Sequence, residues 1–214
     1  MSRLPAPVQR LRRELIRVQT KAFLLRQRHF GKVAFIHINK CGGTSVEKAL
    51  GLPLIHDTAL QRIDKIGRTS WDRMMTFALV RNPYAKAVSH YKYRTKTGEG
   101  GLDDGHIDLD SWIQKAYGEK DPRYHNNPLM FQPCIDWVAD TDGTLLVKRI
   151  LKLEEIATDW PAFCQEAFGK VVPLPHSNAT SSGNSHPADK LNPTSREILR
   201  QHFARDFEAF GYAP

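Results

Sequence analysis

Hydrophobic residues follow a helical rhythm in the first part of the chain. Between residues 7 and 30 they recur three or four positions apart with arginines between them, which predicts one amphipathic helix. The apolar positions are Leu11, Leu15, Val18, Ala22 and Leu25. A basic helix of this kind can lie on an anionic membrane or bind a polyanion. It can equally dock on its own domain with its arginines in water, and the pattern leaves both interpretations open.

From residue 32 onward the pattern changes to short apolar runs separated by helical segments. Unbroken, partly β-branched runs are typical of buried parallel strands. Such runs predict strands at 33–38, 52–55, 74–80 and 145–150. Helices are predicted at 44–50, after the capping-box pair Thr58 and Gln61, at 83–94, 110–117, 134–138 and 159–168, and from Asn192 through Phe207. The alternation predicts an α/β fold, a three-layer domain with a mainly parallel central sheet flanked by helices.

The distribution of charge divides the chain into two parts. The 214 residues include 31 Lys and Arg against 23 Asp and Glu, a formal net charge of +8. Nine of the basic residues and a single acid, Glu14, fall in residues 1–32, and the rest of the chain has 22 of each sign. We therefore expect a basic helical arm over 1–31 and a neutral domain over 32–214. Nucleic-acid-binding domains spread Lys and Arg over their binding face, so this function is disfavoured.

The hydropathy and cysteine patterns indicate a cytoplasmic protein. No apolar run approaches the roughly 18–20 residues that a membrane span needs. The run at 22–25 is also too short for the core of a signal peptide. Cys41, Cys134 and Cys164 cannot all pair within one chain, and no close Cys/His cluster suggests zinc. Contact with a membrane or a polyanion is expected, if at all, through residues 1–31.

The strongest chemical signal is the loop that follows the first predicted strand. Glycines let the backbone approach an anion closely, and the first N–H groups of the next helix point at it. The candidate phosphate-binding residues are Lys40, Cys41, Gly42, Gly43, Thr44 and Ser45. This is not a Walker A loop, which places its Lys after the last Gly and directly before Ser or Thr. The alternative is a plain strand–turn–helix link in which Gly-Gly serves only the turn.

A second signal begins where the strand at 74–80 ends. Arg81 follows that strand, Asn82-Pro83 opens the next helix, and Ser89 lies about two turns into it. The rise from Pro83 to Ser89 is about 9 Å, so a long Arg side chain can clamp one phosphate together with the Ser hydroxyl. The alternatives are a surface ion pair for Arg81 and a solvent-facing position for Ser89.

Together the two segments resemble the sulfotransferases that use 3′-phosphoadenosine 5′-phosphosulfate (PAPS). The closest branch modifies carbohydrates and includes heparan 2-O-sulfotransferase-like enzymes and their bacterial relatives. In that family a Lys-x-Gly-Gly-Thr-Ser loop holds the 5′-phosphosulfate, and an Arg-Asn-Pro-x-x-Arg-x-x-Ser-x-Tyr segment holds the 3′-phosphate. Lys40 and residues 42–45 match the first motif; residues 81–83, Ser89 and Tyr91 match the second. The resemblance runs from about Lys32 to the C-terminus and implies a P-loop-like domain.

Three later segments extend the resemblance. Residues 152–156 look like the family's Arg-x-Glu-x-Leu segment, residues 174–178 resemble its loop near the nucleotide, and residues 210–212 form a typical ending. Several positions depart from the family pattern. Asn39 and Cys41 replace a common Pro and Thr, Lys86 and Lys152 replace arginines, and Ala179-Thr180 stands where Lys-Ser is frequent. None of these changes removes a main ligand.

His56 is the candidate catalytic base. It follows the predicted strand at 52–55 and precedes a helix N-terminus, whose dipole disfavours imidazolium. In the resembling family a His before such a helix, in a His-x-x-Ala pattern matched by residues 56–59, is the base. The alternative is a His that only caps or packs at the turn. His37, in mid-strand, is interpreted as a buried structural residue, and Trp112, Trp137 and Trp160 as core.

The resemblance implies a PAPS-dependent sulfotransferase that needs no metal and acts on a hydroxyl of a saccharide or glycan. In this hypothesis His56 deprotonates the acceptor, Lys40 stabilises charge on the leaving phosphate, and Arg81 with Ser89 selects the 3′-phosphate. One alternative is a P-loop kinase-like phosphotransferase, which would need a Walker lysine and magnesium ligands. The other is a non-catalytic module whose basic arm holds a polyanion or membrane.

Overall fold

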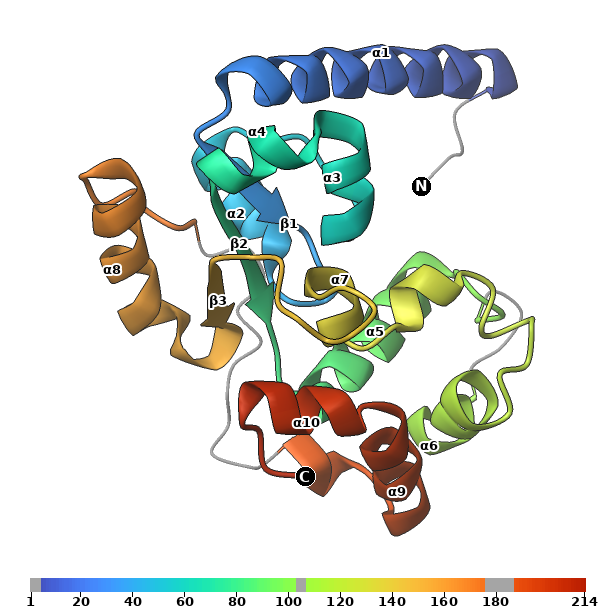
Figure 1. Ribbon diagram of the computed structural model, residues 1–214. Coiled ribbons are helices and arrows are strands. Elements are labelled where there is room, and N and C mark those ends of the chain that lie inside the picture. Colours follow the sequence, from blue (N-terminus) through green and yellow to red (C-terminus); the bar gives the residue numbers. More distant parts are fainter. Residues whose placement is uncertain (1–4, 103–106, 176–186) are drawn as a thin grey trace.

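A parallel sheet forms the centre of the molecule. The computed structural model describes residues 5–102, 107–175 and 187–214. Its sheet has the order β1 (Val33–Ile36), β2 (Met75–Val80) and β3 (Arg149–Lys152), in which Val33 pairs with Met75 and Phe77 with Arg149. All three strands run in the same direction, so their carboxyl ends meet at one edge (Figure 1). The predicted α/β class with a parallel sheet is confirmed.

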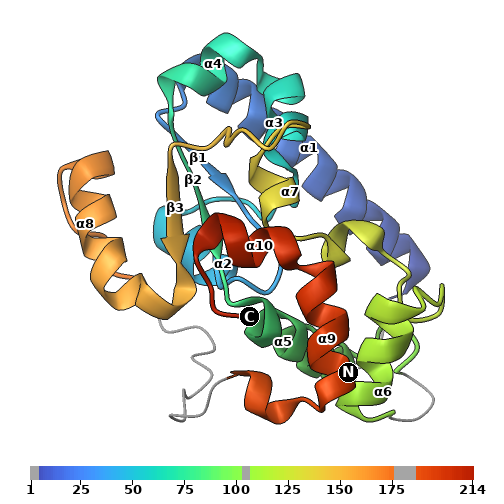
Figure 2. The same ribbon diagram turned by 60° about the horizontal axis from the view of Figure 1, so that its bottom comes forward.

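Helices surround this sheet. They are α1 (Ala6–Phe30), α2 (Gly43–Leu50), α3 (Ala59–Ile66), α4 (Arg68–Arg73), α5 (Pro83–Thr97), α6 (Leu109–Ile113), α7 (Ile135–Val138), α8 (Ile156–Phe168), α9 (Pro193–His202) and α10 (Ala204–Phe210). Short turns of other helix types are η1 (Gln114–Gly118), η2 (Pro128–Phe131), η3 (Leu153–Glu155) and η4 (Pro187–Lys190). Figures 1 and 2 show α8 beside β3 and α1 along α3 and α4. In the part of the chain described, no helix is both long and apolar enough to cross a bilayer.

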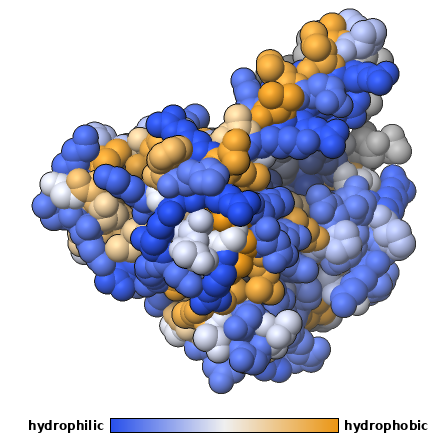
Figure 3. Space-filling view, turned by 45° about the horizontal axis from the view of Figure 1, so that its top comes forward, coloured by the Kyte–Doolittle hydropathy of each residue, from blue (hydrophilic) through white to orange (hydrophobic). Residues whose placement is uncertain are grey.

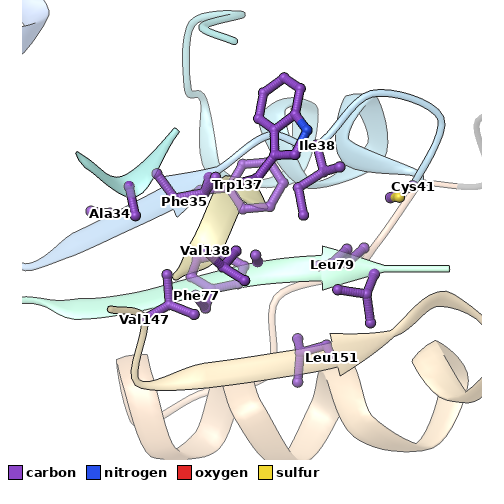
Figure 4. Close-up of a cluster of buried hydrophobic side chains, with 14 of the residues drawn as sticks. Ala34, Phe35, Ile38, Cys41, Phe77, Leu79, Trp137, Val138, Val147 and Leu151 are labelled. Carbon is purple, nitrogen blue, oxygen red and sulfur yellow. The ribbon is translucent and has the colours of Figure 1, made fainter. Parts of the chain in front are cut away.

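Two apolar clusters hold these elements together. The first lies on the sheet, where the Phe77 ring contacts Phe35 at 4.9 Å and Phe163 of α8 at 4.4 Å between centroids. Figure 4 shows this cluster with Trp137 and Cys41 among its members. The second cluster joins α5, α6 and α9 around Trp112. Trp112, Trp137 and Trp160 are all at most 3% exposed, so their assignment to the core is confirmed.

Two of the four predicted strands differ from the structure. Residues 52–55 form no strand, because Pro53 lacks the N–H that a ladder needs and the segment pairs with no neighbour in the described sheet. The strand predicted at 145–150 begins later, at Arg149. Leu145 instead forms an isolated antiparallel bridge with Ala139, the residue after α7, and does not join the sheet.

The helix starts that were predicted from capping residues agree with the structure. The Thr58–Gln61 capping box is present, and Asn82 and Asn192 each accept a hydrogen bond from the N–H three residues on. The predicted C-terminal helix is divided at Phe203 into α9 and α10, and α4 was not predicted. Residues 176–178 of the segment that resembles the family's loop near the nucleotide lie outside the described residues.

Candidate functional site

The loop after β1 is built around two glycines. Gly42 precedes α2 in the left-handed conformation, with φ 83°, and α2 has no side-chain cap on its first N–H groups. A Cβ on Gly42 would lie 2.7 Å from Leu153 Cδ1, and one on Gly43 would lie 2.3 Å from His37 Cδ2. Both positions therefore require glycine, and the start of α2 keeps its amide dipoles directed at the loop, as an anion-binding turn does.

Lys40 occupies a strained and partly buried position in this loop. Its φ of 64° is unusual for a residue with a side chain. Its ammonium lies 4.0 Å from the centroid of the Tyr93 ring. Burial, and next the positive charge of Arg81, lower the pKa of Lys40 to about 8. A bound anion would relieve both effects, so the position suits a residue that meets a negatively charged ligand.

Arg81 reaches the same loop from the neighbouring strand. Its Nη1 donates to the Lys40 carbonyl oxygen at 3.2 Å. The contact follows from topology, since β1 and β2 are adjacent and parallel and the two residues come shortly after each strand ends. The structure thus brings the two cations of the separate sequence motifs together. Their predicted role in binding a cofactor stays a prediction.

Ser89 lies on the accessible face of α5. Between Pro83 and His90 of that helix only Ala85 and Ser89 reach the surface. Ser89 is one turn before Tyr93, the residue that receives the Lys40 ammonium, so both share one helix face. Tyr93 was not identified from the sequence. Its spacing of four residues from Ser89 is the signal that could have revealed it.

The other loop residues differ in what they present. Thr44 is exposed, so its hydroxyl is accessible, whereas Ser45 is buried and its N–H donates to the Gly42 carbonyl at 3.1 Å. The Cys41 thiol faces the core, 1% exposed and 3.8 Å from the Cys134 sulfur (Figure 4). The Cys41 side chain is therefore turned away from a ligand at the loop, and only its backbone could make the predicted cofactor contact.

His56 lies beside the loop through His37. The two imidazole centroids are 4.5 Å apart, and the His37 ring in turn lies against Gly43. His56 Nδ1 donates to the His37 carbonyl oxygen at 3.0 Å, which leaves the lone pair on Nε2. Burial, and next the nearby His37, lower the pKa of His56 below 6.5, so the ring is neutral near pH 7. The strand expected before His56 is absent, and His56 is connected to the loop through His37, which contacts Gly43.

His37 is buried as expected and is also part of this arrangement. Its Nδ1 donates to Glu47 Oε1 of α2 at 2.6 Å. Both side chains are less than 10% exposed. The pair ties the end of β1 to α2 and so fixes the loop between them. Glu47 was not singled out from the sequence, because a partner ten residues away across a turn leaves no local pattern.

Glu154 joins three of the segments that match the family pattern. Its Oε1 accepts the Asn82 N–H at 2.9 Å, directly after Arg81, and its Oε2 accepts the Tyr212 hydroxyl at 3.0 Å. Leu153, next to it, packs against Gly42. Residues far apart in sequence thereby hold the two motifs in fixed positions. Burial, and next Glu154, raise the pKa of Tyr212, which keeps it a hydrogen-bond donor.

Lys86, which stands where the family pattern has Arg, is a support beneath the site. It is 1% exposed, and its ammonium donates to the Gln132 carbonyl at 2.7 Å. Nearby, the buried Asp206 accepts the N–H groups of Cys134 and Ile135 at 2.7 and 2.9 Å. The lysine at this position therefore supports the residues beneath the site and presents no charge to a ligand.

Two hollows of the molecule lie apart from the candidate site. The structure contains a hollow of about 10 Å³ bordered by His37 and Glu47 and another of about 110 Å³ bordered by Arg26 and Phe30. Both lie beneath α1, and neither is lined by Lys40 or Arg81. Over the described ranges, no three His, Cys, Asp or Glu side chains are grouped as a metal site would require.

Comparison with known proteins identifies what the chain is similar to. A family model described as the sulfotransferase family matches residues 21–213 and so includes both motifs. Among solved structures, the crystal structure of a sulfotransferase from Alicyclobacillus acidocaldarius is similar at 14% sequence identity and a TM-score of 0.40, over 89% of this chain and 88% of that one. No curated protein matches the chain.

Proposed function

The chain belongs to the sulfotransferase family, and from this premise we propose that it transfers a sulfuryl group from PAPS to a hydroxyl of a saccharide or glycan. The observation that carries the proposal is the meeting of Lys40 and Arg81 at the carboxyl edge of β1 and β2, beside the start of α2. Ligands of open α/β sheets bind at this edge.

The donors at this edge fit the chemistry of PAPS, which carries one anionic group at each end of its ribose. Lys40, Thr44 and the first N–H groups of α2 suit the 5′-phosphosulfate. Arg81 and Ser89 suit the 3′-phosphate, because a guanidinium and a hydroxyl can share one phosphate. The pKa of Lys40, about 8, supports the assignment, since a half-buried cation beside another cation gains most from an anion.

PAPS supplies a sulfuryl group attached to a phosphate that leaves readily. The protein then has two tasks. His56 Nε2 accepts the proton of the acceptor hydroxyl, and the hydrogen bond from Nδ1 to the His37 carbonyl holds the ring in the tautomer that allows it. Lys40 and the loop N–H groups hold the negative charge that develops on the departing phosphate.

Transfer of radiolabelled sulfate from PAPS to a panel of glycans and small hydroxylated acceptors tests the proposal. We expect label on a saccharide, with transfer by Lys40→Ala strongly reduced. Lys92→Ala, at an exposed lysine on the same helix as Ser89, should be fully active. Label transferred only to non-saccharide hydroxyls would overturn the acceptor class. Phosphate transfer from ATP with magnesium, and none from PAPS, would overturn the donor.

A further inference from the structure

Helix α1 is anchored to the domain through its C-terminal half. Phe23, Leu24 and Gln27 face the domain, and Gln27 Nε2 donates to the Val33 carbonyl at 3.1 Å. Arg62 of α3 donates to Gln27 Oε1 at 3.1 Å. The helix is therefore fixed in direction, and its N-terminal half projects beyond the domain (Figure 1).

The opposite face of α1 is an exposed apolar stripe. Its members are Leu11, Leu15, Val18 and Leu25, with exposed fractions of 72%, 56%, 61% and 61%. Their successive spacings are four, three and seven residues, so they fall on one side of the helix, away from Phe23 and Gln27. Figure 3 shows hydrophobic side chains along the projecting part of the molecule. Large apolar side chains gathered in water mark a surface that contacts something else.

Basic side chains border this apolar stripe on both sides. Successive residues of a helix are 100° apart around its axis, which places one row of basic side chains next to the apolar stripe. This row consists of Arg10, Arg17, Lys21 and Arg28, all exposed. Arg12 and Arg26 border the other side, also exposed. Against these charges the first 32 residues contain a single acid, Glu14. An apolar stripe between two basic borders is the pattern of a helix that lies in the interface of a bilayer.

We propose that α1 binds the surface of an anionic membrane. The apolar stripe enters the boundary between headgroups and acyl chains, and the basic borders contact lipid phosphates. A second copy of α1 would cover the stripe but would bring two strongly positive helices together. A soluble polyanion would neutralise the arginines but would leave the stripe in water. Of these three occupants, an anionic membrane matches both the charge and the apolar surface.

Co-sedimentation of the full-length protein with lipid vesicles tests the proposal. We expect binding to phosphatidylcholine vesicles that contain phosphatidylglycerol, weakening with added salt, and little binding to phosphatidylcholine alone. The double variant Leu15→Glu/Val18→Glu should bind about tenfold less. The control Leu145→Glu/Val171→Glu places the same charges at exposed apolar positions on the domain and should bind like the unchanged protein. Thermal unfolding should be the same for both variants.

Three results would overturn the proposal. The first is equal vesicle binding by the stripe variant and the control. The second is a protein that does not bind vesicles and is a dimer by light scattering, while Leu15→Glu/Val18→Glu is a monomer. The third is a protein that does not bind vesicles and binds heparin, with the same affinity for heparin in Leu15→Glu/Val18→Glu. The last two would assign α1 to a second copy of the chain and to a polyanion, respectively.

Discussion

The arm α1 and the loop at residues 40–45 both carry positive charge, and the environments of their charges are opposite. On α1 the basic side chains are numerous and exposed, and such charges are screened by salt over about 8–10 Å. At the loop a single lysine beside Arg81 is partly removed from water, which lowers the pKa of Lys40 to about 8. The net charge of +8 arises in the arm, so in the proposed function the loop recognises its anion by the placement of a few charges and not by their number.

Removing Lys40 tests this contrast with the largest expected effect. Lys40→Ala should lower kcat/KM for sulfuryl transfer about 10³-fold, because the charge on the departing phosphate loses its closest cation. Arg13→Ala removes one exposed positive charge from the arm and should leave kcat/KM for a soluble acceptor unchanged. Steady-state assays of the two variants compare the loss of a partly buried charge at the loop with the loss of an exposed charge on the arm. Equal effects would show that only total charge matters.

Replacing His56 should have the next largest effect. His56→Ala should lower kcat about 10²-fold through loss of the general base, while the affinity for the product nucleotide stays unchanged. His29→Ala, an exposed histidine on α1, is the matched control. Assays of transfer together with calorimetric titration of the nucleotide separate the two quantities. Full turnover by His56→Ala would remove its assignment as the base.

Arg81 is expected to act mainly on binding. Arg81→Ala should raise KM for PAPS about thirty-fold, as expected for a lost charge-assisted hydrogen bond, with a smaller change in kcat. Glu154→Gln, which weakens the hold on the Asn82 turn, should shift KM in the same direction by less. Initial rates over a range of PAPS concentrations measure both. A loss confined to kcat would show that Arg81 serves the chemical step and not recognition.

The pH dependence should show the smallest effect and reveal both groups at once. The pKa of His56 is lowered, so its protonation should reduce kcat/KM only in acid, below pH 6.5. Lys40 loses its charge as pH rises through about 8, so kcat/KM should fall again there, by about tenfold per pH unit. In Lys40→Arg the alkaline limb should move to higher pH. An alkaline limb that stays in place would assign it to another group.

The sequence predicted the parts of the site that are encoded locally. The turn over Gly42 and Gly43, the caps at Thr58 and Asn82 and the position of Arg81 after a strand all follow from short patterns. The comparisons leave the chemical roles of these residues as predictions. Residues 52–55 were wrongly predicted as a strand because an apolar run does not reveal whether a neighbouring strand exists to pair with it.

Contacts between distant segments could not be predicted in this way. Glu154 meets the Asn82 backbone across 72 residues, and Tyr93 meets Lys40 only because α5 follows β2 and β2 lies beside β1. The side-chain direction of Cys41 is equally a matter of packing, since its neighbour Cys134 comes from a distant segment. Such partners depend on the completed fold, and no short pattern in the sequence records them.

The direction of β1 has a consequence for where the enzyme can work. The strand follows α1 directly and advances about 13 Å before the chain turns into the loop, so the arm joins the sheet at one edge and the loop opens at the other. If α1 rests on a bilayer, the transfer site faces the aqueous side. A long glycan or a freely diffusing saccharide would then meet the site from solution.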